Sequence, residues 1–389
     1  MNIHTINEIA DLSGKYVLVR DDFNVQIVDG TITDVFRIEQ SLSTIRYLIE
    51  SGARVVIMSH LGRPKGERKP ELSLAPIATT LEQLLARPVI FVSDCLDREF
   101  MQDMRNGDVA VLENIRYYNE EEKNDSEFAR KLANGFDYYI NDAFAVSHRA
   151  HASVEAITNF LPSFAGNLLA SEIAELNKLI NNPKRPLIGI IGGAKVSSKV
   201  GVIKSLAHLC DKVIVAGGLG TSFRIAMGAS NIHDNLYEEN LKPTILNIMQ
   251  EFQDKIVLPV SKGTAKTFSP DAARTDKKIA DILPDDMILD EGDESIAEFK
   301  KSIDGAKTIV WNGPVGMAEW QPTWSKGTFE LANYIANKDV VSIVGGGDIV
   351  AALEATNTKD KMTYVSTGGG AFLEFIEGLE LPGIKVLEK

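Results

Sequence analysis

Residues Leu187–Lys195 read LIGIIGGAK, a short apolar run that ends in two glycines and a lysine. The run predicts a strand buried on both faces, because it lacks the apolar/polar alternation of a half-exposed strand. Glycine at its end permits a tight turn and leaves backbone N–H groups open to a ligand. Three more runs in the second half end in this way, and each is expected to lead into a helix: Ile309–Pro314 (IVWNGP), Val344–Asp348 (VGGGD) and Val365–Gly370 (VSTGGG).

The first half of the chain has no such glycine-rich ends. Its matching strand ends carry charged and imidazole side chains instead: Arg20–Asn24 (RDDFN), Ser59–Arg63 (SHLGR) and Ser147–His151 (SHRAH). In an open parallel sheet, ligands bind beyond the carboxyl ends of the strands. We therefore expect one half to hold phosphates with bare backbone and the other to bind a small anion with side chains. This asymmetry suggests a phosphoryl transferase with two substrates.

Runs rich in Val, Ile and Leu alternate with amphipathic stretches, which predicts an α/β fold with parallel sheets. The predicted strands are Tyr16–Arg20, Arg54–Ser59, Val89–Val92, Val109–Glu113, Tyr138–Asn141, Leu187–Ile191, Lys212–Ala216, Lys255–Pro259, Thr308–Asn312, Val340–Val344 and Thr363–Ser366. A chain of 389 residues exceeds the usual size of one hydrophobic core. We therefore expect two doubly wound parallel-sheet domains.

The predicted domain boundary lies in a helix. The apolar residues of Gly166–Asn182 (GNLLASEIAELNKLINN) form one helical stripe, and Pro183 ends it. We interpret residues 166–182 as an interdomain helix between an N-terminal domain, 1–165, and a C-terminal domain, 183–373, with the active site in the cleft between them. An ordinary surface helix of either domain is the alternative, and the sequence barely separates the two.

Composition excludes several classes of protein. The formal net charge of −13 makes the chain a poor general binder of nucleic acid or of anionic membranes. The two cysteines, Cys95 and Cys210, fit neither a disulfide framework nor a metal-ligand spacing. No basic-then-apolar signal pattern opens the sequence, and no apolar run approaches membrane-spanning length. A cytoplasmic protein is expected.

The glycine-rich ends predict a nucleotide site, although neither the P-loop pattern nor the dinucleotide fingerprint is present. Lys195 and Lys199 are four residues apart, so on one helix their ammonium groups would project from the same face. Together with backbone amides and a helix dipole they would suit a polyphosphate. For any single cluster, glycine that simply permits a tight turn is the alternative.

Asp348 is the candidate metal ligand. A carboxylate that faces phosphates at a strand end suits Mg²⁺, which prefers one or two carboxylates with phosphate oxygens and waters. An aspartate that caps the following helix is the alternative, and both roles are compatible.

The first half concentrates cations and imidazoles at or just past its strand ends. They are Arg20, Arg37, His60, Arg63, Arg116, His148, Arg149 and His151. The planar guanidinium group suits bidentate capture of phosphate and carboxylate. Asp22 and Asn24 could accept and donate hydrogen bonds to a substrate hydroxyl. A single arginine could equally form a surface ion pair. These residues do not match the pattern of a catalytic triad or of a zinc site.

These motifs together resemble the phosphoglycerate kinase family, in family order and almost from end to end. The matching stretches are Val17–Val25, Ser59–Gly66, Leu112–Tyr117, Asn141–Ser153, Gly192–Lys199, Trp311–Trp320, Gly345–Asp348 and Ser366–Ala371. The resemblance implies reversible phosphoryl transfer from 1,3-bisphosphoglycerate to MgADP, giving 3-phosphoglycerate and MgATP. It also implies a monomer whose C-terminal tail, 374–389, packs back on the N-terminal domain.

The resemblance also assigns roles to residues. The 3-phosphoglycerate site would comprise Asp22, Phe23, Asn24, Arg37, His60, Leu61, Gly62, Arg63, Arg116 and Arg149. The nucleotide site would comprise Lys195, Lys199, Asn312, Glu319, Gly346, Gly347, Asp348 and Ile349, with Glu319 at the ribose and Asp348 near magnesium. Arg37 and Lys195 would stabilise the phosphoryl group during transfer, helped by backbone amides of Gly368–Gly370, with Gly369 as the third catalytic residue.

Several positions depart from the family pattern. Asp21 stands where valine is usual, Ala216 where a third glycine is usual, and Ser261 where aspartate is common. The stretch Asp290–Asp293 (DEGD) replaces Asp-Ile-Gly-Pro, Ile349 replaces a small hydroxyl residue, and Ala170-Ser171 lacks a lysine. Because most of these lie on the nucleotide side, they bear on nucleotide affinity and base preference.

Two other classes of protein fit the sequence less well. A non-catalytic scaffold with the kinase fold would be expected to lose clustered charges, yet Arg37, Arg149, Lys195 and Asp348 remain. A dinucleotide-dependent oxidoreductase would need a glycine fingerprint followed about 20 residues later by an acidic residue, which neither half offers.

The resemblance further predicts a hinge motion that involves residues 166–182 and the loop 366–370. Closure would bring Arg37 and Lys195 to one phosphoryl group and would exclude water. A small-angle scattering profile is expected to become more compact when both substrates are added. A profile unchanged by the substrates would contradict the hinge.

Overall fold

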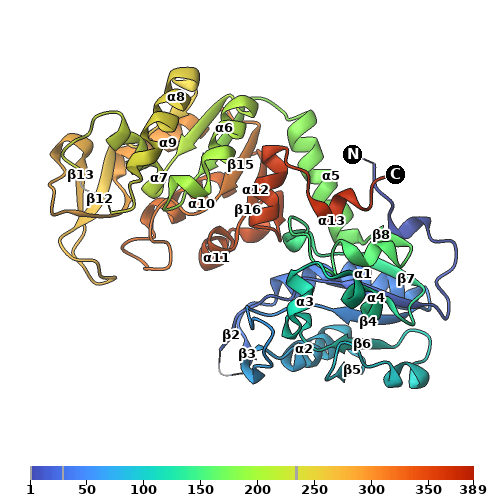
Figure 1. The fold of residues 1–389 in the computed structure, drawn as a ribbon. Helices are drawn as coiled ribbons and strands as arrows, with labels where there is room; N and C mark the ends of the chain where they lie inside the picture. The colour runs from blue at the N-terminus through green and yellow to red at the C-terminus, as the bar shows by residue number, and fades with distance from the viewer. Residues whose placement is uncertain (1, 29, 233–234) are drawn as a thin grey trace. The chain divides into compact units, whose positions relative to one another are not determined.

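The computed structural model describes residues 2–28, 30–232 and 235–389 (Figure 1). It divides into two compact units. Unit 1 comprises Met1–Asn177 and Glu380–Lys389, and unit 2 comprises Lys178–Leu379. The predicted α/β class with two doubly wound parallel sheets is confirmed. Within the described ranges, no helix is both long enough and apolar enough to cross a bilayer.

The described part of unit 1 contains one parallel sheet with the strand order β5-β6-β4-β1-β7-β8. Its strands are β1 (Tyr16–Arg20), β4 (Arg54–Met58), β5 (Val89–Val92), β6 (Val109–Leu112), β7 (Tyr138–Asn141) and β8 (Ser163–Ala165). In register, Val19 of the central strand lies between Ile57 and Ile140. The short β8 was missed by the sequence analysis, because only three residues pair there.

Helices cover both faces of this sheet. The helices of unit 1 are α1 (Phe36–Glu50), α2 (Ala75–Leu85), α3 (Asn119–Glu122), α4 (Ser126–Ala133), α5 (Asn167–Asn181), which continues past Asn177 into unit 2, and α13 (Pro382–Lys385). Val17 and Val19 share one buried cluster with Ile45 of α1, whereas Leu18 lies in another with Phe128 of α4. Alternate residues of one strand therefore bury opposite faces, as the unbroken apolar runs predicted.

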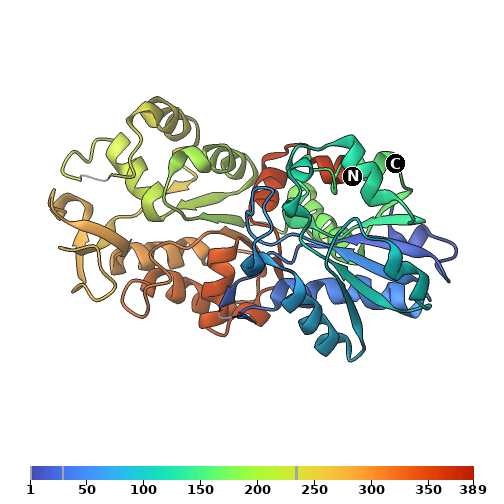
Figure 2. The same ribbon diagram turned by 60° about the horizontal axis from the view of Figure 1, so that its bottom comes forward.

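Both chain termini belong to unit 1. Ile3 forms an antiparallel bridge with Glu388, and the N and C labels lie close together in both views (Figures 1 and 2). The Asn141 side chain donates a hydrogen bond to the carbonyl of Gly383 at 2.9 Å. The last ten residues are therefore fastened to the end of β7.

The described part of unit 2 has a second parallel sheet with the order β11-β10-β9-β15-β16-β17. Its strands are β9 (Leu187–Ile191), β10 (Lys212–Val215), β11 (Ile256–Val257), β15 (Thr308–Asn312), β16 (Val341–Gly345) and β17 (Tyr364–Ser366). Each corresponds to a predicted strand. The ends of β9 and β15 are as predicted, and those of the other four differ by one or two residues.

Helices also lie on both faces of the second sheet. They are α6 (Val200–Leu209), α7 (Gly217–Ala226), α8 (Lys242–Phe252), α9 (Asp293–Ile303), α10 (Lys326–Ala336), α11 (Gly347–Ala355) and α12 (Gly370–Glu377). Trp311 is buried in one cluster with Phe299 of α9 and Leu331 of α10. On the other face, a Cβ at Gly189 would lie 3.2 Å from the Cys210 sulfur, which closely follows α6.

Two parts of the fold were not predicted. Unit 2 also contains an antiparallel sheet of β12 (Ser261–Ala265), β13 (Thr275–Lys278) and β14 (Met287–Glu291), in the order β13-β12-β14. Unit 1 contains the small hairpin of β2 (Ile27–Val28) and β3 (Thr31–Ile32). The strand β12 reads SKGTA, which lacks the apolar run that marks a buried strand.

One expectation about the glycine ends was wrong. The run that ends in Asn312-Gly313-Pro314 leads into a loop, and the next helix, α10, begins only at Lys326. Gly313 has a φ of +77°, which turns the chain away from the strand direction. The ends at Gly345 and Gly368 do lead into α11 and α12.

Candidate active site

The ends of β1 and β4 in unit 1 are locked together by Ser59. Its hydroxyl accepts a hydrogen bond from the Phe23 N–H at 2.8 Å and donates one to the Asp21 carbonyl at 2.7 Å. Because the two strands are parallel neighbours, their following residues meet at one edge of the sheet. Ser59 thereby brings Asp22 and His60 together. This role of Ser59 is not visible in the sequence, where it is one residue of the motif Ser59–Arg63.

Asp22 and Arg37 form an ion pair at this edge. Arg37 Nη1 donates to Asp22 Oδ2 at 2.7 Å, and the Asn24 N–H donates to Asp22 Oδ1 at 2.9 Å. Burial alone would raise the pKa of Asp22, but the Arg37 charge and the Asn24 N–H outweigh it and lower the pKa to about 2. Asp22 is therefore ionised at neutral pH, and it orients Arg37.

His60 is a neutral hydrogen-bonding group. Burial, joined by the positive charges of Arg20 and Arg116, holds its pKa well below the usual range. Arg20 Nη2 lies 3.3 Å from His60 Nδ1, and an arginine can only donate. The ring proton of His60 therefore resides on Nε2, where it can be donated to an anion.

The loop after β4 is tied to the neighbouring segments through Gly62. The Gly62 N–H donates to Asn24 Oδ1 at 2.9 Å, and Arg116 Nη1 donates to the Gly62 carbonyl at 2.9 Å. Burial lowers the pKa of Arg116 to about 10, so it remains a cation at neutral pH. The side chains of Phe23 and Leu61 are buried, so these two predicted residues can offer a ligand only their backbone.

Two of the predicted arginines of unit 1 have side chains without a partner in the described ranges. Arg63 and Arg149 are exposed, and neither side chain has a hydrogen bond or ion pair with a residue in the described ranges. Guanidinium groups without partners are suited to capture an anionic ligand. His148, next to Arg149, has a pKa lowered to about 4 by burial and then by the Arg149 charge. It is therefore uncharged and adds no positive charge at neutral pH.

In unit 2, Lys199 and Asn312 join the ends of three neighbouring strands. Lys199 Nζ donates to the Gly192 carbonyl at 2.6 Å and to Asn312 Oδ1 at 2.7 Å. Asn312 Nδ2 donates in turn to the Gly345 carbonyl at 2.5 Å. The predicted residues that follow β9, β15 and β16 thus converge within one unit. Burial lowers the pKa of Lys199 to about 8, although the Asp348 charge acts in the opposite direction.

Lys195 and Lys199 do not share a helix face, which corrects the sequence-based expectation. Lys195 has extended backbone angles of φ −113° and ψ 134°, a short 3₁₀ turn covers Val196–Ser198, and α6 begins only at Val200. The Lys195 side chain is exposed and has no hydrogen bond or ion pair with a residue of the described ranges. Lys199 is therefore part of the framework, whereas Lys195 is free to reach a ligand.

The loop before α11 exposes Asp348. Gly346, with a φ of +120°, occupies the position that precedes the helix, so Asp348 is not the capping residue. Asp348 is exposed in the first turn, and the Ile349 side chain is fully buried, so Ile349 can offer only its backbone. Within the described ranges, no group of three or more His, Cys, Asp or Glu is arranged so that it could hold a metal ion. A single exposed carboxylate fits Mg²⁺ held mainly by phosphate oxygens and waters.

The loop before α12 presents backbone amides beside Gly346. A Cβ placed on Gly369 would lie 3.8 Å from the Gly346 Cα, so the two loops are neighbours. The Gly368 N–H is already bonded to Ser366 Oγ at 3.1 Å, which leaves the amides of Gly369 and Gly370 available. The positive end of the helix dipole favours an anion at this point. Glu319 is exposed in the loop between β15 and α10.

Comparison with known proteins decides the family. The family model described as phosphoglycerate kinase matches residues 6–379. The chain is 46% identical over 397 residues to the phosphoglycerate kinase of Geobacter metallireducens, covering 100% of this chain and 99% of that protein. It is 44% identical to that of Borrelia garinii over 395 residues, with both chains fully covered. This chain belongs to the phosphoglycerate kinase family.

Solved structures of this family have the same fold. The phosphoglycerate kinase of Coxiella burnetii superimposes with a TM-score of 0.86 at 38% identity, covering 99% of this chain and 98% of that one. The phosphoglycerate kinase of Pyrococcus horikoshii gives a TM-score of 0.87 at 30% identity, with coverage of 99% and 98%.

Asp21, which departs from the usual valine of phosphoglycerate kinases, is fully buried next to the site. Neither of its carboxylate oxygens has a hydrogen-bond partner in the described ranges. Burial, and then the nearby Asp142, raise its pKa well above the usual range. Asp142 is itself buried, and it accepts a hydrogen bond from the Leu169 N–H of α5 at 3.0 Å. Burial raises the pKa of Asp142 to about 7.

Replacing Asp21 by valine is expected to stabilise the protein at pH 8 by about 1–3 kcal/mol, the cost of a buried unsatisfied polar group. A carboxyl with a raised pKa contributes stability that is full below its unfolded pKa of about 4 and is lost as the pH rises. Urea unfolding from pH 5 to 8 should therefore show a steeper loss of stability in the unaltered protein than in Asp21→Val. Parallel pH curves for the two proteins would contradict this account.

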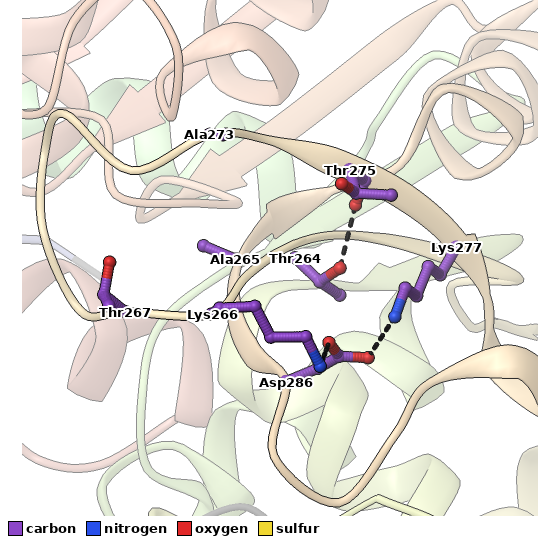
Figure 3. A pocket seen from close by; sticks show the side chains of 8 residues that line it. All are labelled: Thr264, Ala265, Lys266, Thr267, Ala273, Thr275, Lys277 and Asp286. Atoms are coloured by element: carbon purple, nitrogen blue, oxygen red, sulfur yellow. Dashed lines mark hydrogen bonds and ion pairs between the residues drawn. The ribbon is translucent and has the colours of Figure 1, made fainter.

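The antiparallel sheet of unit 2 contains a cavity of about 200 Å³ that none of the predicted site residues lines (Figure 3). Lys266 and Lys277 both point to Asp286, at 2.9 and 2.6 Å. Because Asp286 and Asp285 balance these two lysines, the cavity has no free cation for a phosphate.

Proposed function

We propose that this chain catalyses reversible phosphoryl transfer from 1,3-bisphosphoglycerate to MgADP, giving 3-phosphoglycerate and MgATP. The chain is a kinase by family, and its relatives carry the name of that activity. The observation that carries the proposal is that the strand ends of the two units bear different kinds of anion-binding group. Free and half-buried arginines gather at the strand ends of unit 1, and glycine amides with two lysines gather at those of unit 2.

Unit 1 is the proposed site for the phosphoglycerate. Arg37, Arg63, Arg116 and Arg149 would bind its phosphate and carboxylate, and His60 would donate a neutral hydrogen bond. Asp22 and the Asn24 amide would contact the hydroxyl group. The ion pair between Asp22 and Arg37 supports this assignment, because it fixes the direction of the guanidinium group.

Unit 2 is the proposed nucleotide site. Lys195 and the amides of Gly346, Gly347 and Gly369 would contact the phosphates, while Lys199 and Asn312 hold the three loops together. Glu319 would bind the ribose. Asp348 would hold Mg²⁺, which supplies positive charge at the phosphate oxygens when it is bound with the nucleotide.

The chemistry requires no general base. The attacking atom is already ionised in both directions, either a carboxylate oxygen or an oxygen of the ADP β-phosphate. Catalysis then depends on alignment of the reacting oxygens and on neutralisation of charge on the transferred group. We propose that the Arg37 and Lys195 side chains and the Gly369 amide supply that neutralisation. Each of these groups is accessible to a ligand.

Further proposals concern organisation and setting. We propose a 3-phosphoglycerate domain at 1–165 with the tail 374–389, a nucleotide domain at 183–373 and a connecting helix at 166–182. The division into two units on either side of Asn177 supports this organisation. We also propose a cytoplasmic monomer that acts on small molecules and not on nucleic acid or membranes. The net charge of −13 and the buried, unpaired Cys95 and Cys210 support that setting.

The function is tested by phosphoryl transfer from MgATP to 3-phosphoglycerate, coupled to NADH oxidation by glyceraldehyde-3-phosphate dehydrogenase. We expect robust turnover that is lost in Lys195→Ala. Folded protein that shows no turnover even at high nucleotide concentration would instead favour a non-catalytic scaffold.

Nucleotide affinity is expected to fall as the pH rises above about 8. Burial lowers the pKa of Lys199 to about 8, so its positive charge is lost in this range. If the cation is required, the KM for MgATP should be roughly tenfold higher at pH 9 than at pH 7. Lys199→Arg keeps its charge and should give a flat profile, measured with 3-phosphoglycerate saturating. Equal profiles for the two proteins would assign the pH effect to another group.

A further inference from the structure

Two buried charges of unit 2 lie within or next to segments that depart from the family pattern. Lys262 follows Ser261 on β12, and Glu291 ends β14. The two residues are directly opposite in the antiparallel ladder, and both side chains are fully buried. Lys262 Nζ lies 2.7 Å from Glu291 Oε1. The segment 216–218, which also departs from the family pattern, is in contact with both.

The pair binds both polar groups at the Gly217 turn. The Gly217 N–H donates to Glu291 Oε1 at 2.7 Å, and Lys262 Nζ donates to the Gly217 carbonyl at 3.0 Å. Gly217 has a φ of +65°, in the region that disfavours other residues, and it is the first residue of α7. A charged pair is therefore used to fix one peptide segment in an unusual conformation.

The Gly217 turn packs against the loop Gly192–Lys195, which ends in the proposed phosphate ligand Lys195. A Cβ placed on Gly217 would lie 3.0 Å from the Gly193 carbonyl oxygen, and one on Gly218 would lie 2.5 Å from that of Ala194. The Leu219 N–H donates to the same Gly193 carbonyl at 3.1 Å. The position of Gly193 and Ala194 therefore depends on where the turn is held, and Lys195 follows directly.

We propose that the Lys262–Glu291 pair positions the nucleotide site, by holding the Gly217 turn against the Gly192–Lys195 loop. The inference rests on the proposed function, because it takes Lys195, at the end of that loop, as a phosphate-binding residue. The pair touches no reacting group, so its effect is on placement.

Stability alone gives no reason for the pair. A buried ion pair is often matched or exceeded in stability by apolar residues of similar volume, because removing two charges from water is costly. Glu291 Oε2 is also buried without a hydrogen-bond partner in the described ranges, which adds to that cost. Arg224, Arg274 and Asp290 are other charged groups close to Glu291. What the pair uniquely contributes is the two hydrogen bonds at Gly217.

The test is the double variant Lys262→Met/Glu291→Leu, which removes the pair without leaving a lone buried charge. We expect MgADP to bind roughly tenfold more weakly by calorimetry, a factor that corresponds to about 1.4 kcal/mol. The KM for 3-phosphoglycerate should stay within about twofold, and hydrogen exchange at residues 193–195 and 217–219 should be faster. Unchanged MgADP affinity in the folded double variant would overturn the proposal.

Two controls separate positioning from general loosening. Lys277→Met/Asp286→Leu removes an ion pair next to the cavity of the same antiparallel sheet, without contact to Gly217 (Figure 3). It should leave MgADP affinity unchanged, and an equal loss there would overturn the proposal. Glu291→Gln keeps the size of the side chain and an acceptor for the Gly217 N–H. It should weaken binding less than the double variant, and the opposite order would contradict positioning.

Failure of this inference is distinct from failure of the proposed function. Suppose that the unaltered protein binds MgADP and catalyses the reaction, and that the double variant binds MgADP equally well. This result would contradict only the positioning role. If the unaltered protein neither binds MgADP nor catalyses the reaction, both the proposed function and this inference are contradicted. If the double variant does not fold, Lys262→Met decides. It removes the donor to the Gly217 carbonyl and leaves Glu291, whose pKa burial raises, able to take up a proton. Affinity identical to the unaltered protein would then contradict the proposal.

Discussion

Lys195→Ala is expected to lower turnover by about 10²-fold or more, the scale of removing one donor that stabilises a transition state. The structural reason is that the Lys195 side chain has no partner within the described ranges, whereas Lys199 is hydrogen-bonded to Gly192 and Asn312. The Lys195 side chain is exposed, yet its backbone follows a loop held through Gly193. The Lys195 backbone is therefore held in position while its ammonium group remains available to a ligand. The coupled assay with both substrates saturating measures the effect.

The same variant should leave stability almost unchanged, since an exposed side chain without partners contributes little. Lys212→Ala is the matched control, because Lys212 is also exposed but begins β10, at the opposite end of the strand from the site. Its turnover should match that of the unaltered protein. A loss in Lys195→Ala of less than about fivefold, with an unchanged urea midpoint, would remove Lys195 from the chemistry.

The sequence predicted the two parallel sheets because their strands are unbroken apolar runs buried on both faces. Leu187–Ile191 and Thr308–Asn312 appear in the structure with the predicted ends. The strands β12 and β14 carry buried charges, Lys262 and Glu291, at positions where an apolar residue would have marked a strand. Pairing across the ladder reduces the cost of burying the two charges, and this pairing is not visible along one sequence.

The candidate site was predictable in its location but not in its chemistry. Strand ends in parallel sheets share an edge, and at such an edge Lys199 donates a hydrogen bond to Asn312. The neutral state of His60 depends on burial and on Arg20 and Arg116, residues distant in sequence. The separation of Lys195 from Lys199 depends on where α6 begins, and no capping residue marks that point.

Arg37→Ala is expected to lower turnover by about 10²-fold or more and, unlike Lys195→Ala, to destabilise the protein as well. Arg37 donates to the buried Asp22 at 2.7 Å, so its removal leaves a carboxylate without its main partner. We expect a loss of about 1–3 kcal/mol in the free energy of unfolding at pH 7, the cost of an unsatisfied buried group. The coupled assay and urea unfolding on the same preparation measure the two effects.

The pH dependence of that destabilisation identifies its origin. In the unaltered protein the pKa of Asp22 is lowered to about 2, because burial is outweighed first by the Arg37 charge. That pair contributes stability above the unfolded pKa of about 4, and the contribution is lost as the pH falls toward 2. Without Arg37, burial raises the pKa of Asp22 instead. The gap between Arg37→Ala and the unaltered protein should therefore narrow as the pH falls below 4.

A second substitution separates the structural loss from the catalytic one. Asp22→Asn/Arg37→Ala removes the lone carboxylate and should recover most of the stability, while turnover stays low because the cation is still missing. Arg37→Lys keeps a charge near Asp22 but lacks the planar fork, so it should retain stability better than turnover. If the double variant recovered turnover together with stability, Arg37 would act by holding Asp22 in place, and the transferred phosphoryl group would need another cation from unit 1.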